Sequence, residues 1–313
     1  MYSKLKDIPS FKSWKIIKKV NEGWSSDLKF YVEDYYGKKL LLRIANAANY
    51  YEKLEEFNFI KKCNTLDFEM SQAIEIGFCN RNTNVYIILT WVEGHSLNKV
   101  IGNLNNKDQY RLGVEAGKIL KAIHSLKLEP NEKTIVYNPK DKILSKLSRY
   151  ENSKNRIKED QFAIDFIKNN LKKINALPRV YRHGDYHPGN LILTPLNTIG
   201  VIDFNRWKYG DIYEDFYKIQ SFSIEVSIPF SIGQIHGYFT GEPPLEFWNI
   251  LSIYVAYSSL NLIVWSEKFG EDSINGMKQR CITAFNDYNK FKSIIPNWYK
   301  VNSNDYINTI PLS

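Results

Sequence analysis

The sequence predicts an α+β fold with two lobes of unequal size. Residues 1–89 read as short apolar strands separated by polar turns, with one amphipathic helix among them, and most of the remaining chain shows helical periodicity. The 313 residues also exceed the length at which a single hydrophobic core stops growing. We therefore predict a small antiparallel-sheet lobe with one helix over 1–89, a hinge at 90–94, and a larger, mainly helical lobe over 95–313.

The small lobe is predicted from two hairpins and a helix. The segment KFYVEDYYGKKLLLRIA holds two apolar strands on either side of the turn-like Asp34–Gly37 region. Two further strands are expected near Gln72–Phe78 and Val85–Trp91. Between the pairs, a helix is expected around Tyr50–Cys63. Its apolar face consists of Leu54, Phe57, Ile60 and Cys63.

The large lobe should contain helices at about 105–125, 140–150 and 156–175, and loops with short strands at 180–206. Residues 247–265 carry no charge, and a stretch of that length is able to span a bilayer. Asn and Ser residues interrupt it, however, and there is no second such stretch. We expect a buried helix of the large lobe, because a helix that is apolar all round usually lies in a protein core.

The composition is that of a folded soluble protein, with 43% hydrophobic and 24% charged residues. The net charge of +8 raises the question of nucleic-acid binding, but the Lys residues of 140–173 recur on the polar faces of amphipathic helices. They are therefore interpreted as a solvated surface, and no nucleic-acid partner is expected.

The three cysteines, Cys63, Cys79 and Cys281, are widely spaced and form no CxxC pair. This argues against a disulfide framework and against a zinc site. The N-terminus lacks the apolar region of a secretory signal. Together these features predict a cytoplasmic protein without a membrane partner.

The densest chemical signal is the segment HGDYHPGNLIL, which begins at His183 and contains Asp185 and Asn190. Asp203 lies ten residues beyond Leu193, inside the apolar strand GVIDF. A carboxylate that accepts a hydroxyl proton and hard oxygen ligands for Mg²⁺ are what phosphoryl transfer requires. Each residue alone could be an ordinary turn or cap residue. Their joint spacing favours catalysis, and a zinc pair of His183 and His187 is disfavoured because no third ligand lies near.

This pair of motifs, HGDYHPGN and VIDF, resembles the aminoglycoside phosphotransferase family, which are protein-kinase-like small-molecule kinases. The resemblance extends over nearly the whole chain and implies a two-lobed protein-kinase-like fold. It implies Asp185 as catalytic base and Asn190 with Asp203 as ligands of Mg²⁺. His183 and His187 become structural residues of the loop, and Asp211 is assigned as a helix cap.

The resemblance also implies a site for ATP or GTP, which acts as co-substrate. Adenine would meet the hinge backbone at Thr90, Trp91 and Val92, and apolar contacts are expected from Leu41 and Ile202. Two positions depart from the family pattern. Arg43 stands where a phosphate-binding Lys is common, with Glu56 favoured over Glu52 and Glu55 as its partner. A glycine-rich motif is missing, and Gly23, Ser25 and Ser26 are assigned to phosphate binding instead.

The sequence says least about the acceptor molecule. An aminoglycoside-like or other cationic antibiotic fits the region 183–313, which has 13 acidic and 9 basic residues. The residues assigned to its binding are Glu214, Asp215, Glu267, Glu271 and Trp265, with Asp272 as a further candidate.

Two alternatives stay open. A metabolic kinase for choline, homoserine, a sugar or a fructosamine would use an aromatic wall drawn from Trp207, Tyr213, Trp248, Tyr254, Tyr257 and Trp265, although these aromatics more often form core. A catalytically silent binding or coat-associated relative is disfavoured because Asp185, Asn190 and Asp203 are all present. A monomer or weak dimer is expected.

Overall fold

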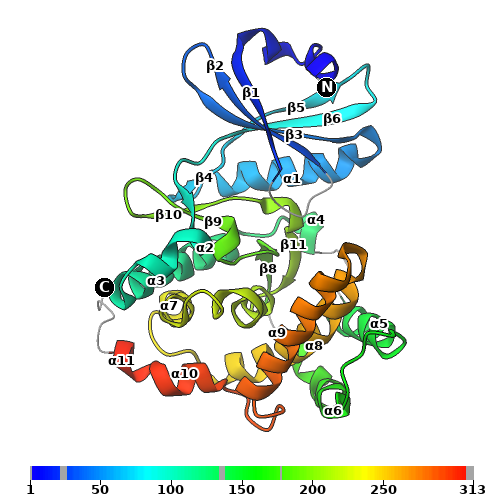
Figure 1. The fold of residues 1–313 in the computed structure, drawn as a ribbon, viewed down its shortest axis with the longest axis vertical. Helices are drawn as coiled ribbons and strands as arrows, with labels where there is room; N and C mark the ends of the chain where they lie inside the picture. Colours follow the sequence, from blue (N-terminus) through cyan, green and yellow to red (C-terminus); the bar gives the residue numbers. More distant parts are fainter. Residues whose placement is uncertain (1, 22–26, 134–137, 177, 308–313) are drawn as a thin grey trace. The chain divides into compact units, whose positions relative to one another are not determined.

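The computed structural model describes residues 2–21, 27–133, 138–176 and 178–307. The chain folds into two units (Figure 1). The first comprises the chain up to His95 together with Ile192–Trp207, and the second comprises Ser96–Leu191 and the chain from Lys208 onward. The linear division at 90–94 did not anticipate that residues 192–207 return to the first unit.

The first unit is built on an antiparallel sheet with the strand order β1-β2-β3-β6-β5. Its strands are β1 (Trp14–Val20), β2 (Leu28–Asp34), β3 (Lys39–Asn46), β5 (Ala73–Cys79) and β6 (Asn84–Thr90). The β2–β3 hairpin turns where predicted: Asp34 Oδ1 accepts from the N–H groups of Tyr36 and Lys38, and Gly37 has a φ of +80° that glycine adopts without a steric penalty.

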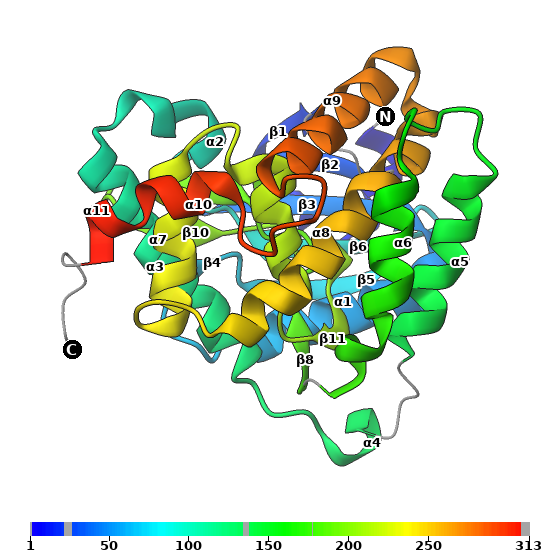
Figure 2. The ribbon, with the colours of Figure 1, turned by 90° about the horizontal axis from the view of Figure 1, so that it is seen from below.

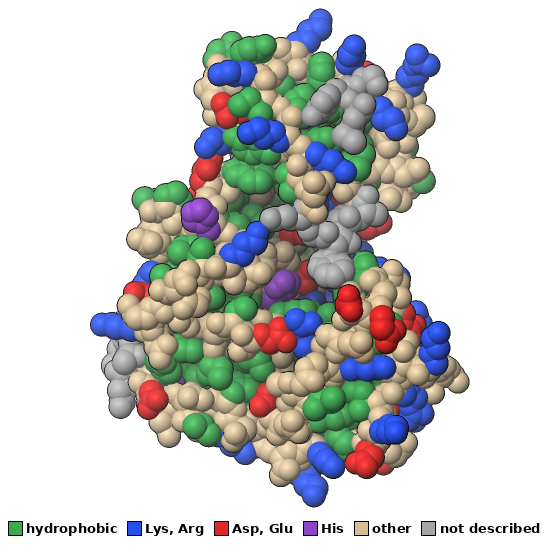
Figure 3. Space-filling view, in the orientation of Figure 1, with side chains coloured by type: hydrophobic (Ala, Val, Ile, Leu, Met, Phe, Trp, Pro, Cys, Tyr) green, Lys and Arg blue, Asp and Glu red, His purple; other side chains and the backbone are tan. Residues whose placement is uncertain are grey.

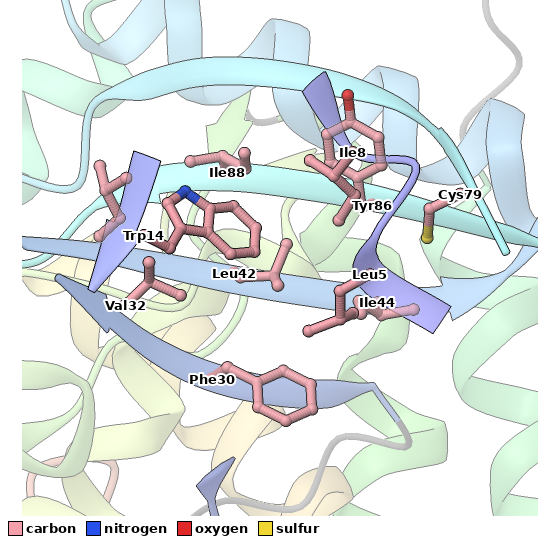
Figure 4. Packing of buried hydrophobic residues seen from close by; sticks show 11 residues of the cluster. Leu5, Ile8, Trp14, Phe30, Val32, Leu42, Ile44, Cys79, Tyr86 and Ile88 are labelled. Atoms are coloured by element: carbon pink, nitrogen blue, oxygen red, sulfur yellow. The ribbon is translucent and has the colours of Figure 1, made fainter. Parts of the chain in front are cut away.

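Helix α1 (Tyr50–Cys63) has the predicted bounds and lies along one face of this sheet (Figure 1). The opposite face is covered by the N-terminal segment, whose Leu5 and Ile8 belong to one buried cluster with Leu42, Ile44 and Tyr86 of the sheet (Figure 4). Because successive side chains of a strand point to opposite faces, Arg43 must point away from this core, toward α1. The sheet therefore separates an apolar face from a charged one.

A second sheet has the strand order β4-β10-β9-β7. Its strands are β4 (Glu69–Met70), β7 (His95–Ser96), β9 (Leu191–Leu193) and β10 (Ile199–Val201). The parallel pairing of Gly200 with Glu69 and of Val201 with Met70 joins residues 192–207 to the first unit. This pairing places Asp203, two residues after β10, in the same unit as Arg43.

The second unit is mainly helical. Its helices are α2 (Leu97–Val100), α3 (Asn106–His124), α4 (Pro130–Lys133), α5 (Pro139–Glu151), α6 (Gln161–Asn170), α7 (Ile228–Phe239), α8 (Leu245–Ser266), α9 (Glu271–Asp287), α10 (Asn297–Asn302) and α11 (Asn304–Ile307). The strands β8 (Arg179–Arg182) and β11 (Lys208–Asp211) pair antiparallel. The fold class is the predicted one, a five-stranded antiparallel sheet with one helix followed by a mainly helical part.

The predicted helix at 156–175 begins later, at Gln161, and continues after Asn170 as a 3₁₀ segment to Ala176. The residues before Gln161 are held by side-chain contacts instead of helical backbone hydrogen bonds. The N–H of Ile157 donates to the hydroxyl of Tyr150 over 2.9 Å, and Arg156 pairs with Asp160. Local helical periodicity was overridden by these contacts.

The uncharged stretch forms α8, which lies beside α5, α6 and α9 (Figure 2). By length and composition alone it is the single helix in the described part of the chain that is able to cross a membrane. Within the protein, however, 83% of its most apolar window is buried, as in the core helix of a soluble protein. The interpretation as a core helix is confirmed.

Candidate active site

The buried carboxylate of Asp215 holds the loop that carries Asp185. Asp215 accepts hydrogen bonds from the main-chain N–H groups of His183 and Gly184, each over 2.9 Å. His124 Nε2 lies 3.2 Å from the same carboxylate, and Arg182 Nη1 lies 3.8 Å away. Burial opposes ionisation, but the hydrogen bond from His124 and the charge of Arg182 outweigh it, so the pKa of Asp215 is lowered to about 2.

The loop itself is held by its own side chains. His183 is fully buried, and its Nδ1 accepts from the N–H of Asp185 over 3.2 Å. Tyr186 is fully buried and donates its hydroxyl to Ala116 O on α3 over 2.7 Å. His187 Nδ1 accepts from the N–H of Gly189 over 3.1 Å. Both histidines therefore hydrogen-bond to the backbone of the loop that carries them.

Asp185 is half-buried, and three groups surround it. Lys218 Nζ lies 2.7 Å from its Oδ1, and His187 Nε2 lies 3.5 Å from the same oxygen. Asn190 Nδ2 donates to the main-chain carbonyl of Asp185 over 2.8 Å. The carboxylate is thus oriented within the second unit, and the amide of Asn190 is fixed beside it.

Asp203 lies in the first unit, just beyond β10. Its backbone adopts a left-handed conformation with a φ of 63° and a ψ of 60°, which Asp tolerates better than most residues. Lys29 Nζ is 3.6 Å from its Oδ2, and Arg43 Nη1 is 3.9 Å from its Oδ1. Two positive charges from the sheet therefore converge on this carboxylate.

Arg43 belongs to a buried cluster of four charges. It pairs with Glu56 of α1, as predicted, and its Nη2 lies 2.6 Å from Asp27. Lys53 bridges the same two acids, at 2.8 Å from Asp27 and 3.1 Å from Glu56. Burial alone would lower the pKa of Arg43, but the charges of Glu56 and Asp27 outweigh it and raise that pKa. The opposing charges balance within the cluster.

The hinge residues lie at the end of β6 and beyond it. The N–H of Thr90 donates to Gln72 O over 2.9 Å, and the N–H of Trp91 donates to Lys39 O over 3.0 Å. An adenine contact from Thr90 would therefore have to use its carbonyl. Val92 is buried, while Leu41 of β3 and Ile202 after β10 are half-buried, which suits apolar contact with a base. Gly23, Ser25 and Ser26, assigned to phosphate binding, lie outside the described residues.

Glu214 and Asp215, which were assigned to substrate binding, are buried and paired with residues of this chain. Glu214 is only 4% exposed, and it is paired with Lys142 at 2.8 Å and with Arg182 at 3.3 Å. Asp215 is only 1% exposed and anchors the loop. Tertiary partners bury and neutralise both acids, which was not predicted from the sequence.

The other acceptor candidates are accessible. Glu267 accepts from Ser153 Oγ over 2.6 Å and from Asn155 Nδ2 over 2.9 Å, so it ties α8 to the segment after α5. Glu271 lies exposed in the first turn of α9. Trp265 is half-buried beside Phe269. The remaining aromatics of the alternative wall are buried in the core: Trp207, Tyr213, Trp248, Tyr254 and Tyr257.

Asp211 was predicted to cap the next helix, but the N-cap position of Glu214–Phe216 is occupied by Tyr213, and Asp211 closes the short turn after β11. It accepts from the N–H of Tyr213 over 3.0 Å and from the hydroxyl of Tyr254 over 2.9 Å. Burial raises its pKa to about 7. The short local bond matches the general preference of Asp for turns, but the partner from α8 gives it a role in the core.

The donor set suits Mg²⁺ better than a transition metal. Among the described residues there is no group of three or more His, Cys, Asp or Glu that is placed to hold a metal ion. Asp203 of the first unit offers a carboxylate oxygen, and Asn190 of the second unit offers an amide oxygen. Each is a hard oxygen donor of the kind that Mg²⁺ takes from proteins.

Four residues of this region escaped prediction: Asp27, Lys29, Lys53 and Lys218. Lys29 alternates with apolar residues on β2, which reads as a solvent-facing position of an amphipathic strand. Lys53 lies on the predicted helix at the position three residues before Glu56, a spacing that does signal an ion pair. Lys218 has no local signal, because its contact with Asp185 depends on the tertiary fold.

Comparisons with known proteins concern the family and the fold of this chain. A family described as "Phosphotransferase enzyme family" matches residues 16–248. No curated protein matches the sequence at a significant level. Solved structures match in fold at low identity, which shows the architecture and leaves the substrate undetermined.

Three solved structures illustrate the similarity. The GDP complex of aminoglycoside 2′-phosphotransferase-IIIa is 15% identical, covers 90% of this chain and 95% of its own, and superposes with a TM-score of 0.68. A thermostable mutant of an aminoglycoside phosphotransferase with ADP and hygromycin B is 15% identical, with coverages of 91% and 98% and a TM-score of 0.68. Amicoumacin kinase with AMP-PNP and Ca²⁺ is 11% identical, with coverages of 91% and 92% and a TM-score of 0.64.

Proposed function

Because the chain belongs to the phosphotransferase enzyme family, we propose that it transfers the γ-phosphoryl group of ATP or GTP to a hydroxyl of a small molecule. The observation that carries the proposal is the orientation of Asp185 by a fully buried loop anchor. Asp215, His183 and Tyr186 fix the main chain on both sides of this residue. Such fixation of a half-buried carboxylate is what a positioned proton acceptor requires.

The reaction is balanced by groups of this chain and the two substrates. The proton of the acceptor hydroxyl passes to the carboxylate of Asp185, and the acceptor oxygen forms a bond to the γ-phosphorus. The bond between that phosphorus and the β–γ bridging oxygen breaks, and the nucleoside diphosphate leaves with the electron pair. Mg²⁺, when bound, supplies charge neutralisation on the phosphates, with Asn190 and Asp203 as its protein ligands.

The first unit supplies the proposed phosphate-binding groups. Arg43 and Lys29 lie near Asp203, where a magnesium-bound triphosphate would need positive charge. Arg43 is shared between Glu56 and Asp27, so its own charge is largely balanced, whereas Lys29 adds further positive charge. Both are therefore assigned to the nucleotide side of the site.

An antibiotic with several hydroxyls and positive charges, of the aminoglycoside kind, is the acceptor we propose first. Exposed carboxylates at Glu267, Glu271 and Asp272 support it, because an acidic surface attracts polyamines. The buried state of Glu214 and Asp215 removes two of the charges on which this expectation depended.

A metabolic kinase with a neutral or anionic acceptor is the second candidate, and one observation favours it. Lys218 lies next to Asp185. The ring of Phe222, which contacts Lys218, also has the guanidinium of Arg280 at 5.3 Å. Positive charge beside the reacting hydroxyl disfavours an acceptor that carries an ammonium group there.

We place the enzyme in the cytoplasm, where nucleoside triphosphates are abundant and its three buried cysteines would stay reduced. A monomer or weak dimer is part of the same proposal. Nucleic acid is not proposed as a partner: on the face seen in Figure 3, Lys and Arg side chains are scattered among neutral and acidic ones instead of forming one basic patch.

The test is magnesium-dependent release of ADP and GDP against a panel of acceptors. The panel holds aminoglycosides, macrolides, tuberactinomycin-type peptides, choline, homoserine and simple sugars. Release that depends on one class identifies the acceptor. The variant Asp185→Ala should lose at least about 10²-fold in turnover and keep its nucleotide affinity. Asp165→Ala, which removes an exposed carboxylate on α6, is the matched control and should leave both unchanged.

Near-normal turnover in Asp185→Ala would refute the assignment of the base. Absence of release with every acceptor, together with absence of nucleotide binding, would favour the silent binding relative instead.

A further inference from the structure

Lys218 is a buried cation in direct contact with the proposed base. Its Nζ lies 2.7 Å from Asp185 Oδ1, and its side chain is only 3% exposed. It lies in the segment between the 3₁₀ turn Glu214–Phe216 and the π turn Ile219–Ser223, far from the Asp185 loop in sequence. Lysine is almost never fully buried unless it is paired, so the position requires an explanation.

The surroundings of Lys218 favour a strong interaction. Its ammonium lies 5.2 Å from the ring centre of Tyr217 and 4.9 Å from that of Phe222. Phe222 also packs on His187, with 5.0 Å between the ring centroids. These rings exclude water from the ion pair, and an ion pair in such a setting is screened far less than one at the surface.

The same segment links Lys218 to the anchor of the loop. Asp215, which binds the N–H groups of His183 and Gly184, precedes Lys218 by less than one helical turn. One short segment therefore fixes both the main chain before Asp185 and the carboxylate of Asp185. If the segment had a purely structural role, the contact with the main chain would be enough and the contact with the carboxylate of Asp185 would not be needed.

We propose that Lys218 is a positioning residue for phosphoryl transfer, which holds the carboxylate of Asp185 in the orientation that receives the acceptor proton. This inference rests on the proposed function. Lys218 acts through Asp185: the proton still passes from the acceptor hydroxyl to the carboxylate, and Lys218 neither gains nor loses one. Misplacement of a reacting group by about 1 Å is enough to cost about 10²-fold in rate.

The test measures ADP release from ATP with water as acceptor and, once the panel identifies one, with the cognate acceptor. Lys218→Met should lower kcat about 10- to 100-fold and leave the KM for ATP unchanged, because the nucleotide-binding residues are not altered. Lys218→Arg retains the positive charge and should recover part of the loss. The matched control is Lys290→Met, since Lys290 also lies over an aromatic ring, that of Phe162 at 5.7 Å, on different elements of the unit. It should leave kcat unchanged.

A double-mutant cycle separates positioning from structure. In an Asp185→Asn background, Lys218→Met should cause no further loss of kcat, because the carboxylate that it positions is gone. Equal losses in both backgrounds would overturn the proposal, as would a Lys218→Met enzyme that turns over at the normal rate.

Folding and function are kept apart by two further measurements. Near-ultraviolet circular dichroism checks that each variant is folded. If Lys218→Met is not, Lys218→Gln takes its place, and an unchanged kcat in a folded Lys218→Gln enzyme would overturn the proposal. A wild-type chain that binds no nucleotide and releases no ADP would refute the proposed function, and this inference with it. A normal wild-type rate with no effect at Lys218 would refute this inference alone.

Discussion

The main-chain N–H of His183 donates to the carboxylate of Asp215 over 2.9 Å, and the next N–H along the chain does the same. A buried acid that is 1% exposed thus fixes the backbone just before Asp185. Because Arg182 and His124 also contact Asp215, its charge is compensated where a lone buried carboxylate would be costly. The loop that carries Asp185 is therefore held in shape by a buried residue that lies 30 positions later in the sequence.

Replacement of Asp215 by Ala should therefore reduce stability as well as activity. It removes the acceptor of two backbone N–H groups and one of the two acids that face Arg182, and removal of one member of a buried ion pair costs ~3–5 kcal/mol. Urea unfolding followed by tryptophan fluorescence measures the loss. Asp165→Ala, an exposed position, serves as the control and should stay within ~0.5 kcal/mol of the wild type. Equal midpoints for the two variants would contradict the anchoring role.

The sequence predicted elements better than contacts. Helix α1 was predicted with its observed bounds, because its apolar positions recur with helical spacing, and the Asp34–Gly37 turn followed from local turn chemistry. The pairing of Arg43 with Glu56 was also predicted. The burial and pairing of Glu214 were not predicted, because its partners, Lys142 and Arg182, are remote in sequence. Side-chain burial by remote segments leaves no periodic signal for a reader of one sequence.

Lys29 should contribute to nucleotide binding. Its ammonium is 3.6 Å from Asp203, at the place where phosphate charge is expected, and a charge-assisted hydrogen bond contributes ~1.5–3 kcal/mol. Lys29→Met should weaken ADP binding in magnesium about 10-fold or more by isothermal titration calorimetry. Lys18→Met removes an exposed lysine of β1 and should bind ADP normally. An unchanged affinity of Lys29→Met for ADP would show that other groups bind the phosphates.

Gly117 permits close packing of α3 on α7. A Cβ at this position would lie 2.2 Å from the carbonyl oxygen of Gln234 and 2.6 Å from the nitrogen of Tyr238, and both are backbone atoms that cannot rotate away. Gly117→Ala should thus lower the free energy of unfolding by about 3 kcal/mol.

Gly276→Ala on α9 is the matched control. Its nearest neighbour is the flexible end of Arg280 at 3.5 Å, so the gain in helix propensity, up to ~1 kcal/mol, should dominate. Thermal unfolding compares the two variants with the wild type. A stabilised Gly117→Ala would show that the two helices separate readily.

Two buried groups should give the stability opposite dependences on pH. Burial lowers the pKa of His236 to about 4, where its ring nitrogens meet the hydroxyls of Tyr110 and Tyr299 at 3.0 and 2.9 Å. Burial raises the pKa of Asp211 to about 7. For His236, the unfolded chain binds more protons between its folded pKa and ~6.5, so stability rises with pH there. For Asp211, the folded protein binds more protons between ~3.9 and its folded pKa, so stability falls with pH.

In the wild type the two contributions to the pH dependence of stability oppose each other between pH ~4.5 and ~6.5. A variant that lacks one of the two groups should therefore show the pH dependence caused by the other. His236→Asn should leave the Asp211 dependence, so that its stability falls as pH rises, by at most ~1.4 kcal/mol per pH unit. Asp211→Asn should leave the His236 dependence, so that its stability rises with pH. Urea unfolding across this range measures both slopes, and the difference between the variants at each pH cancels contributions from other groups. If burial perturbs the pKa of both groups, the stability of the two variants must change with pH in opposite directions. Stability curves that run parallel for the two variants would therefore show that neither group has a different pKa in the folded and unfolded protein.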